Sequence, residues 1–342
     1  MGIRFEKEIL ENKVLNPMKD FQLDTRAIEV RIDPLTGHTS RVVDRFGKRA
    51  PSKSNIDAFL QLTRDCFFCA EKVEVVTPRI MPEISSEERI KVGEAILFPN
   101  MTAYSNYSAV CIYSTQHFIE IGSFKPELIA NNLKAHRRYI KLVAAYDPTV
   151  SFCSIIGNYL PPSGGSVIHP HLQSSVDKIP TNQELEMISC SEGYCQENGS
   201  SFWDDLVEAE RNEEERFIGS TGQVSWLASF APIGFNEIRA VVAHKSRITD
   251  LGDDDIESLA MGISAALKYY GANHVNSFNL AIYSGPLRGD AGHFRVNLRL
   301  ISRSTLEPWY RSDATGFERL FWEPITDRRP EEFCADIRPY FR

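Results

Sequence analysis

The strongest constraint on the fold of this sequence is an internal duplication. Residues 226–300 repeat the order of features in residues 96–173: strand, turn, strand, histidine, amphipathic helix, strand, and a segment with proline, glycine and histidine. Within it, His293 stands 124 positions after His169. A unit of about 75 to 80 residues that occurs twice has too few copies for a solenoid. The sequence therefore predicts two related α+β halves.

Local patterns supply the elements of these halves. In residues 27–51, apolar residues alternate around the turn Asp33-Pro-Leu-Thr-Gly37, which predicts a β-hairpin at the edge of a sheet. Residues 95–104 and 109–117 predict two strands joined by a turn. Residues 123–145 combine an early proline with apolar residues at helical spacing, which predicts a helix with one apolar face.

Composition excludes several classes of protein. The chain has 342 residues and a net charge of −8, which argues against general binding of nucleic acid. It lacks a run of about 18 apolar residues, so we expect no membrane span. The first residues are charged and form no apolar signal segment, which predicts a cytoplasmic protein. Seven cysteines are an odd number, which favours thiols or metal ligands over a disulfide framework.

Residues 157–173 carry the strongest functional signal. A loop rich in glycine, proline and serine offers amide N–H groups to an anion, and it leads into His169-Pro-His171. In an extended segment, residues two apart share a face, so we expect His169, His171 and Gln173 to point the same way. The segment has two interpretations. It is either a phosphate site with a nucleophile beside it, or a pair of structural histidines next to a surface loop.

A second short motif is Cys66-Phe-Phe-Cys69. Two thiols at this spacing can bind one zinc ion, and the same spacing also serves redox chemistry or arises by chance. A redox pair usually opens a helix after a strand in a small βαβ unit, which the aromatic interior of this motif does not suggest.

The residues before His169 add a recognisable pattern. Asn158 stands eleven positions and Ser166 three positions before His169, which opens the run His-Pro-His-X-Gln. This arrangement resembles the active-site signature of galactose-1-phosphate uridylyltransferases, the transferase branch of the histidine-triad superfamily. The resemblance implies an α+β fold of two tandem histidine-triad-like halves, each with an antiparallel sheet flanked by helices. Residues 1–185 would carry the zinc site and the nucleophile, and residues 186–342 the sugar contacts.

The resemblance also implies roles at the catalytic centre. His171 would be the nucleophile, with a neutral imidazole available near pH 7, and it would become covalently attached to the nucleotidyl phosphorus. Ser166 and Asn158 would act beside it, and Gly165 with the loop amides would hold the α-phosphate oxygens, where charge accumulates. Gln173 would complete the site.

The same resemblance assigns a metal site. Cys66, Cys69, His117 and His169 would together bind one zinc ion. Four protein ligands leave no open coordination position, so the ion would be structural. Its effect would be to fix the strand that carries His171, because a small displacement of a nucleophile is costly to the rate.

Four further positions are substrate contacts by the same resemblance. Arg49 falls on one arginine of a phosphate-binding segment, and Arg45 stands next to Phe46, which falls on the other. Asn100 would contact the nucleoside, and Glu318, in Gly-Phe-Glu, would bind hexose hydroxyls. Surface arginines and a carboxylate on a turn are the plain alternatives at these positions.

Gln173 favours transfer or phosphorolysis over hydrolysis, because an amide can donate a hydrogen bond but cannot shuttle a proton. The first hypothesis is a hexose-1-phosphate uridylyltransferase that uses UDP-glucose. The second is an ADP- or GDP-sugar phosphorylase, and the third is a zinc-stabilised nucleotide-binding protein without catalysis.

The partners implied are a nucleotide sugar with a sugar phosphate or inorganic phosphate, and a second copy of the chain in a homodimer. In the second half, Arg295 replaces the nucleophile position and also a histidine of a second metal site found in some relatives.

Overall fold

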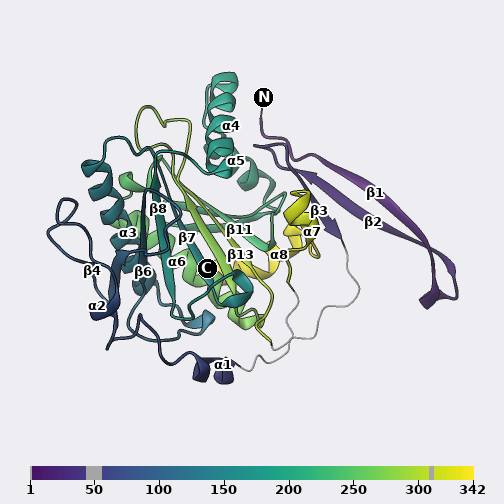
Figure 1. Cartoon of the computed structure of the whole chain (residues 1–342). Coiled ribbons are helices and arrows are strands. Elements are labelled where there is room, and N and C mark those ends of the chain that lie inside the picture. The colour runs from purple at the N-terminus through teal and green to yellow at the C-terminus, as the bar shows by residue number, and fades with distance from the viewer. Residues whose placement is uncertain (1, 44–55, 308–311) are drawn as a thin grey trace.

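The computed structural model describes residues 2–43, 56–307 and 312–342. Its centre is a sheet in which ten strands of these residues are hydrogen-bonded in one continuous order (Figure 1). From one edge to the other the strands are β4 (Ile90–Val92), β5 (Ala95–Pro99), β6 (Tyr107–Ile112), β8 (His171–Asp177), β7 (Phe152–Tyr159), β12 (Phe278–Tyr283), β13 (Asn297–Ser302), β11 (Phe235–Val242), β10 (Val224–Ala228) and β9 (Phe217–Thr221).

The order of the strands shows the duplication directly. The five strands on one side come from the first repeat, the five on the other side come from the second, and their order is mirrored about the junction of β7 with β12. These two strands pair antiparallel, with Asn158 opposite Asn279. The prediction of an α+β fold with two related halves is therefore confirmed, while the boundary at residue 185 stays a prediction. The halves share one sheet because each leaves an unpaired edge that the other satisfies.

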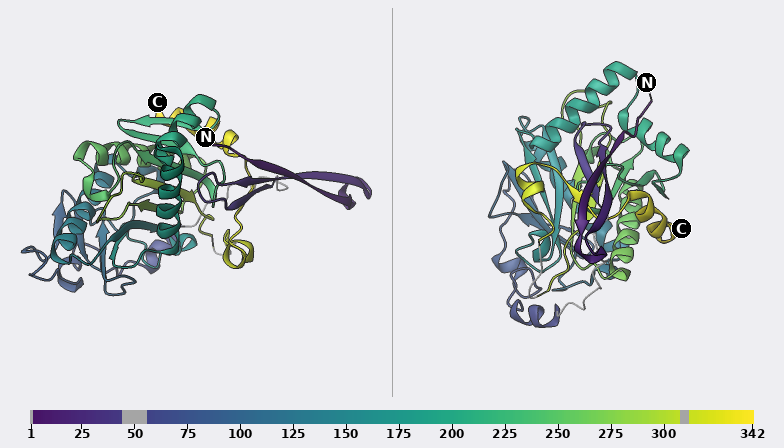
Figure 2. Two further views of the ribbon diagram at one scale, coloured as in Figure 1. Left: turned by 90° about the horizontal axis from the view of Figure 1, so that it is seen from above. Right: turned by 90° about the vertical axis from the view of Figure 1, so that its right-hand side faces the viewer.

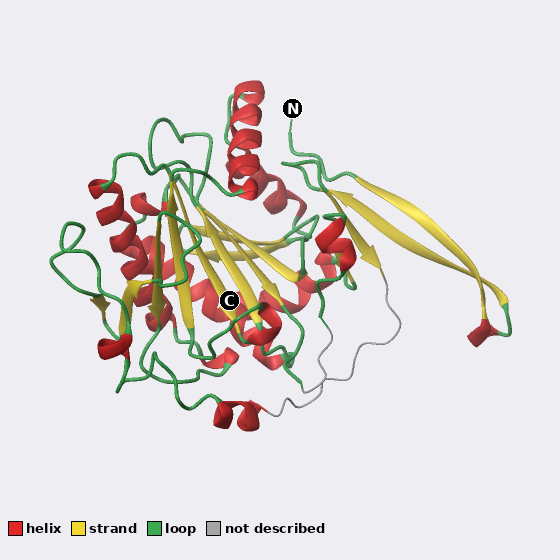
Figure 3. Ribbon diagram, in the orientation of Figure 1, coloured by secondary structure: helices red, strands yellow, loops and turns green. Residues whose placement is uncertain are grey.

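One face of this sheet is covered by two long helices, α3 (Pro126–Tyr146) and α6 (Asp253–Ala272) (Figure 3). Both were expected from the spacing of their apolar residues. In α3, Ile129, Leu133 and Ile140 lie on one side and are buried against the sheet. The helices contribute to the main hydrophobic core, which extends across both halves. No helix in the described parts of the chain is long and apolar enough to cross a membrane.

The opposite face is covered differently in the two halves. In the second half, α4 (Asn182–Asn198) and α5 (Phe202–Glu213) bring Phe202 and Trp203 against Leu227 and Val241. In the first half, a small cluster of buried residues is covered by Phe68, from the segment between α1 (Ile56–Leu62) and α2 (Val73–Val76), and by Val73, the first residue of α2. The other members of the cluster are Ile96, Phe98, Val110 and Ile112. Polar residues of β7 and β8 face this side, which places the candidate site there.

A separate sheet contains β1 (Lys7–Asn16), β2 (Gln22–Ile32), β3 (Thr39–Val43) and β14 (Ile325–Thr326) in that order. β2 and β3 form the predicted hairpin, but its predicted place at a sheet edge was wrong, because β1 and β14 flank it. The paired strands β1 and β2 project from the body as an arm (Figure 2). The predicted phosphate contacts Arg45 and Arg49 lie outside the described residues.

Buried ion pairs tie this sheet to the C-terminal helix α8 (Pro330–Ile337). Glu331 accepts two hydrogen bonds of 2.8 Å from Arg31, which is 1% exposed, and one of 3.1 Å from Arg216. Burial alone would raise the pKa of Glu331, but the hydrogen bonds and charge of Arg31, assisted by Arg216, lower it to about 2. The ionised carboxylate is thus strongly favoured in the folded protein.

Replacing Glu331 with glutamine is expected to lower the free energy of unfolding at pH 7 by on the order of 3 kcal/mol, since the pKa falls from 4.5 to about 2. The folded pKa is depressed, so this stabilisation is present above pH 4.5 and is lost as the pH falls towards 2. Urea unfolding should show that the difference at pH 3 is less than about half of that at pH 7. Glu332→Gln, an exposed neighbour on α8, is the control. Equal stability of wild type and Glu331→Gln at pH 7 would contradict this interpretation.

Candidate functional site

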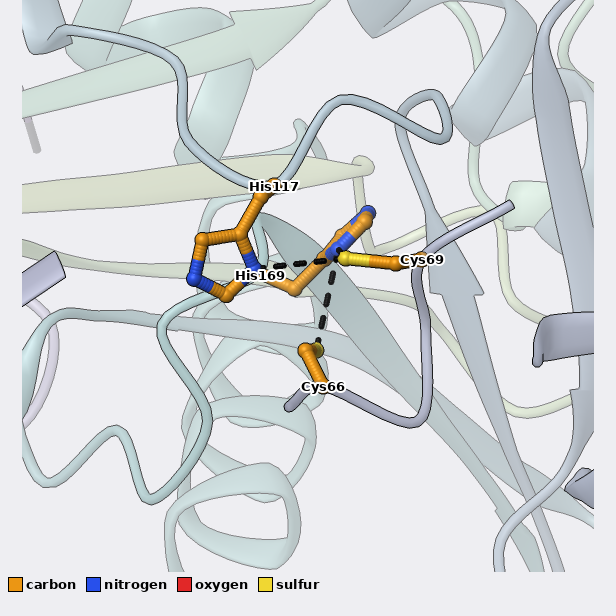
Figure 4. Close-up of side chains that lie close together, drawn as sticks. All are labelled: Cys66, Cys69, His117 and His169. Atoms are coloured by element: carbon orange, nitrogen blue, oxygen red, sulfur yellow. Dashed lines mark hydrogen bonds between the residues drawn. The ribbon is translucent and has the colours of Figure 1, made fainter. Parts of the chain in front are cut away.

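Four predicted metal ligands come together from three separate segments (Figure 4). Cys66 and Cys69 lie in the loop before α2, His117 in the loop after β6, and His169 immediately before β8. The ligand atoms all lie within 4.8 Å of one another. His169 Nδ1 is 3.8 Å from each Sγ, and His117 Nδ1 is 3.4 Å from Cys69 Sγ. Two sulfurs and two imidazole nitrogens can form a tetrahedral metal site.

Each histidine of this cluster is oriented by a contact on its far side. His169 Nε2 donates to the carbonyl oxygen of Ser114 at 2.7 Å, so its proton is on Nε2 and the lone pair is on Nδ1. His117 Nε2 lies 3.3 Å from Thr63 Oγ1, which also leaves Nδ1 facing the thiols. Burial lowers the pKa of His169 to about 4, so the imidazole is in its neutral, ligating form.

The thiols need a cation to ionise together. Burial, and next the neighbouring Cys66, raise the pKa of Cys69 to about 11. Without a positive charge the Cys69 thiol would stay protonated, whereas a bound metal ion favours the thiolate. The residues present therefore fit a divalent metal of the zinc type.

His171 is the first residue of β8 and is half-buried. Its Nδ1 donates to the carbonyl oxygen of His169 at 2.7 Å, so Nε2 carries the lone pair. Burial lowers the pKa of His171, which keeps the ring neutral. The ring of Phe68 meets both His169 and His171 edge-on, at centroid distances of 6.0 and 5.5 Å. The arrangement holds an unprotonated ring nitrogen in a fixed orientation, which is what a nitrogen nucleophile would require.

His171 and Gln173 lie on the same face of β8, as expected from their spacing, and both are half-buried. Leu172 and Ser174 between and after them are buried on the helix side. β7 pairs with β8 so that Ile156 is opposite Gln173, and continuing this register by two residues brings Asn158 opposite His171. Three of the predicted catalytic residues thus share one face of the sheet.

The loop after β7 turns back tightly onto the end of the strand. Leu160 and Gly164 have φ values of 68° and 87°, on either side of the short 3-10 turn Pro161–Ser163. A Cβ at Gly165 would lie 2.7 Å from the carbonyl oxygen of Asn158 and 3.0 Å from that of Leu160, so only glycine fits there. Ser166 follows and is exposed. The amide of Gly165 donates to the carbonyl oxygen of Leu160 at 3.2 Å, so its predicted contact with a phosphate stays a prediction. The loop therefore brings the Ser166 hydroxyl close to the strand that carries Asn158.

The remaining predicted contacts take more local roles in the structure. Asn100 directly follows β5, and its side-chain oxygen accepts a hydrogen bond from Thr102 N at 3.0 Å. Glu318 lies in α7 (Gly316–Leu320), where its carboxylate accepts from Thr315 N at 2.7 Å in a capping box. The structure thus gives Glu318 a capping role, and its predicted contact with a hexose stays a prediction.

The second repeat is built differently at the equivalent of His171. Arg295 Nη2 donates to Asp204 Oδ2 at 2.6 Å, and Arg295 Nε donates to the other oxygen at 3.1 Å. This ion pair ties α5 to the segment before β13. The position that His171 occupies in the first half therefore carries an ion pair in the second.

Several residues of the site were not predicted. Thr63 and Ser114 orient the two histidines of the Cys–His cluster, and Phe68 packs on both histidines of the His-Pro-His segment. Asn279, from the second half, donates to Asn158 Oδ1 at 2.6 Å. Ser114 acts through a backbone carbonyl, which any residue would supply, so no signal marks it. The aromatic interior of Cys66-Phe-Phe-Cys69 and the pairing of repeats were the available signals for Phe68 and Asn279.

Comparison with known proteins gives one close sequence relative and several similar structures. No family model matches the chain. An uncharacterised protein of Archaeoglobus fulgidus is 32% identical over 339 residues, which cover 98% of each chain.

Two solved structures illustrate the likeness of fold. An ADP-glucose phosphorylase from Arabidopsis thaliana with bound ADP-glucose has a TM-score of 0.71 at 18% identity and covers 91% of this chain and 98% of its own. A uridylyltransferase structure has a TM-score of 0.66 at 17% identity, with the same shares covered. At such identities the likeness concerns the fold.

Proposed function

We propose, from the premise that this chain belongs to the family of the Archaeoglobus fulgidus protein and has the fold of the galactose-1-phosphate uridylyltransferase-like enzymes, that it transfers nucleotidyl groups from nucleotide sugars. The observation that carries the proposal is His171. Its Nδ1–H is bound to a carbonyl oxygen at 2.7 Å, so the free lone pair is on Nε2, and the edge-on contact with Phe68 helps to fix the ring.

In the first step of the proposed reaction, Nε2 of His171 attacks the α-phosphorus of the nucleotide sugar. A P–N bond forms, and the bond from the α-phosphorus to the bridging oxygen breaks. The sugar phosphate leaves with that electron pair, and it needs no proton because a phosphate is a stable leaving group. In the second step, an oxygen of the acceptor phosphate attacks the same phosphorus and the P–N bond breaks, which regenerates the free imidazole.

The groups around His171 suit the charge that builds up on the phosphorus oxygens. Gln173, Asn158 and Ser166 can each donate a hydrogen bond. A side-chain amide cannot take a proton from water, so Gln173 and Asn158 stabilise the transition state without promoting hydrolysis.

The proposed metal is a zinc ion held by Cys66, Cys69, His117 and His169, and it would supply structural rigidity. With all four positions taken by the protein, it leaves substrate binding to the other residues. The carbonyl oxygen of His169 accepts the Nδ1–H of His171, so a fixed His169 backbone also fixes the nucleophilic ring. The metal site would thus position His171 indirectly, through the backbone of His169.

The first candidate acceptor is a hexose 1-phosphate, with UDP-glucose as donor. A second candidate is inorganic phosphate, which would make the protein an ADP- or GDP-sugar phosphorylase. Arg295 favours this second candidate. It stands where the resemblance places a histidine ligand of a second metal site, and here it forms an ion pair with Asp204 instead. Relatives that lack this second metal site include nucleotide-sugar phosphorylases. A homodimer and a cytoplasmic location stay predictions, and light scattering tests the former.

Intact-mass spectrometry tests the proposal. The metal-loaded protein is mixed with UDP-glucose, ADP-glucose or a GDP-hexose without acceptor, and we expect a nucleoside monophosphate adduct with one of them. Adding galactose 1-phosphate or labelled inorganic phosphate then shows which acceptor discharges it. A folded, metal-loaded protein that forms no adduct with any of the three would leave nucleotide binding without catalysis as the function.

A further inference from the structure

A chain of hydrogen bonds crosses from the second half of the protein to the candidate site in the first. Asp313 accepts hydrogen bonds of 2.6 and 2.9 Å from Arg303, and Arg303 Nη1 donates to Asn279 Oδ1 at 2.6 Å. Asn279 Nδ2 then donates to Asn158 Oδ1 at 2.6 Å. We call these four residues the amide relay. The ion pair of Arg303 with Asp313 is largely enclosed, with side chains 16% and 11% exposed.

The relay has only one possible direction. A guanidinium group donates and cannot accept, so the atom of Asn279 that faces Arg303 must be its oxygen. The amide nitrogen of Asn279 therefore faces Asn158, and the atom that it meets there must be an oxygen. Because the Arg303 guanidinium can only donate, it decides which end of the Asn158 amide points towards the second half.

The order of strands fixes where the other end points. β7, which carries Asn158, lies between β12 with Asn279 and β8 with His171. Oδ1 of Asn158 is held on the β12 side, which leaves its Nδ2 for the β8 side, where the register continued by two residues places His171. An N–H donor of the neighbouring strand is thus available on the His171 side.

Asn279 also holds the loop that follows β7. Its amide nitrogen has two hydrogens, and besides Asn158 it lies 3.0 Å from the carbonyl oxygen of Ser163. Ser163 ends the short turn that leads into Gly164 and Gly165. One side chain of the second half is thus bound to both the predicted catalytic asparagine, Asn158, and the predicted phosphate-binding loop.

We propose that Asn279 and Arg303 are positioning residues, which hold the Asn158 amide with its N–H donor directed at the phosphoryl group that His171 attacks. The proposal rests on the proposed function. An anionic oxygen of the substrate gains from a donor and is repelled by the carbonyl oxygen of a reversed amide. The second half, which lacks the nucleophile, contributes in this way to the reaction of the first.

The test is a double-mutant cycle on the rate of adduct formation in a single turnover, with UDP-glucose, ADP-glucose and a GDP-hexose as probes. In Asn279→Asp, both side-chain oxygens accept, so one can bind Arg303 and the other Asn158 Nδ2, which reverses the Asn158 amide. We expect the rate to fall by about 10²-fold, the usual cost of losing one oriented donor. In an Asn158→Ala background, the same substitution should cost less than about 3-fold, because no amide is left to reverse.

The cycle separates orientation from other effects of the new carboxylate. Its charge, and its repulsion of the Ser163 carbonyl oxygen, are present in both backgrounds and cancel in the comparison. Asn279→Ala is the second variant, for use if Asn279→Asp does not fold, and it should also lose most of its effect when Asn158 is alanine. Thermal unfolding of each variant shows whether a change in rate follows a change in stability.

The possible outcomes are distinct. If wild type forms the adduct and both Asn279 variants react at the wild-type rate, or cost the same factor with and without Asn158, the relay does not orient this amide. If wild type forms no adduct with UDP-glucose, ADP-glucose or a GDP-hexose, the proposed function fails and the relay proposal fails with it. A large loss that disappears in the Asn158→Ala background supports the proposal.

Discussion

Replacing His171 with asparagine is expected to lower the rate of nucleotidyl-adduct formation by at least about 10⁴-fold, because the substitution removes the only group proposed to attack phosphorus. The asparagine amide can still donate to the carbonyl oxygen of His169, so the start of β8 should keep its geometry. Metal content and the unfolding temperature should therefore stay near those of wild type. The measurement is intact mass against time after mixing with the nucleotide sugar that labels the wild type.

His274→Asn is the matched control for this prediction. His274 is exposed and has a φ of 60°, a conformation that asparagine adopts readily. This variant should form the adduct at the wild-type rate. Equal labelling of the wild type and of His171→Asn would exclude His171 as the nucleophile, whatever its effect on stability.

Replacing Cys66 with serine is expected to lower the affinity for zinc by at least about 10²-fold, because a hydroxyl is a far weaker zinc ligand than a thiolate. Residues that only hydrogen-bond to metal ligands can already contribute up to about 10²-fold to metal affinity, so loss of a ligand should cost at least as much. Loss of the ion leaves His117 and His169 without a shared partner and frees the loop before α2. The protein should unfold at a lower temperature, and adduct formation should fall because His171 is bound to the His169 backbone. Elemental analysis after dialysis, with thermal unfolding, measures both effects.

Cys195→Ser controls for the loss of a thiol as such. Cys195 is a half-buried cysteine of α4 that is not part of the ligand cluster. It should leave zinc content and activity unchanged. A Cys66→Ser protein that retains one equivalent of tightly bound zinc would show that the cluster is not the metal site.

The main architecture could be predicted because its signals are local or repeated. The duplicated order of features predicted two halves, and the sheet shows them mirrored about β7 and β12. The resemblance inferred from His-Pro-His is confirmed at the level of the fold. The hairpin of β2 and β3 was predicted, whereas its place at an edge was wrong, because β14 is supplied by residues almost three hundred positions later.

The sequence by itself determined which chemical groups the candidate site contains and the local structure of the short segments that carry them. The residues of Cys66-Phe-Phe-Cys69 and of His169-Pro-His171 have fixed spacing, so their types and the face shared by His171 and Gln173 follow from the chain alone.

The tertiary structure decided how these groups are oriented. Hydrogen bonds to partners far along the chain decide which ring nitrogen carries the proton and which way a side-chain amide points. Such partners are the backbone carbonyl of Ser114, which any residue type could supply, and Asn279 across the junction of the repeats. Sequence spacing carries no information about such partners, because they meet only when separate strands pair. The direction of the Asn158 amide therefore depends on Arg303, a residue of the other half, through contacts that exist only in the folded sheet.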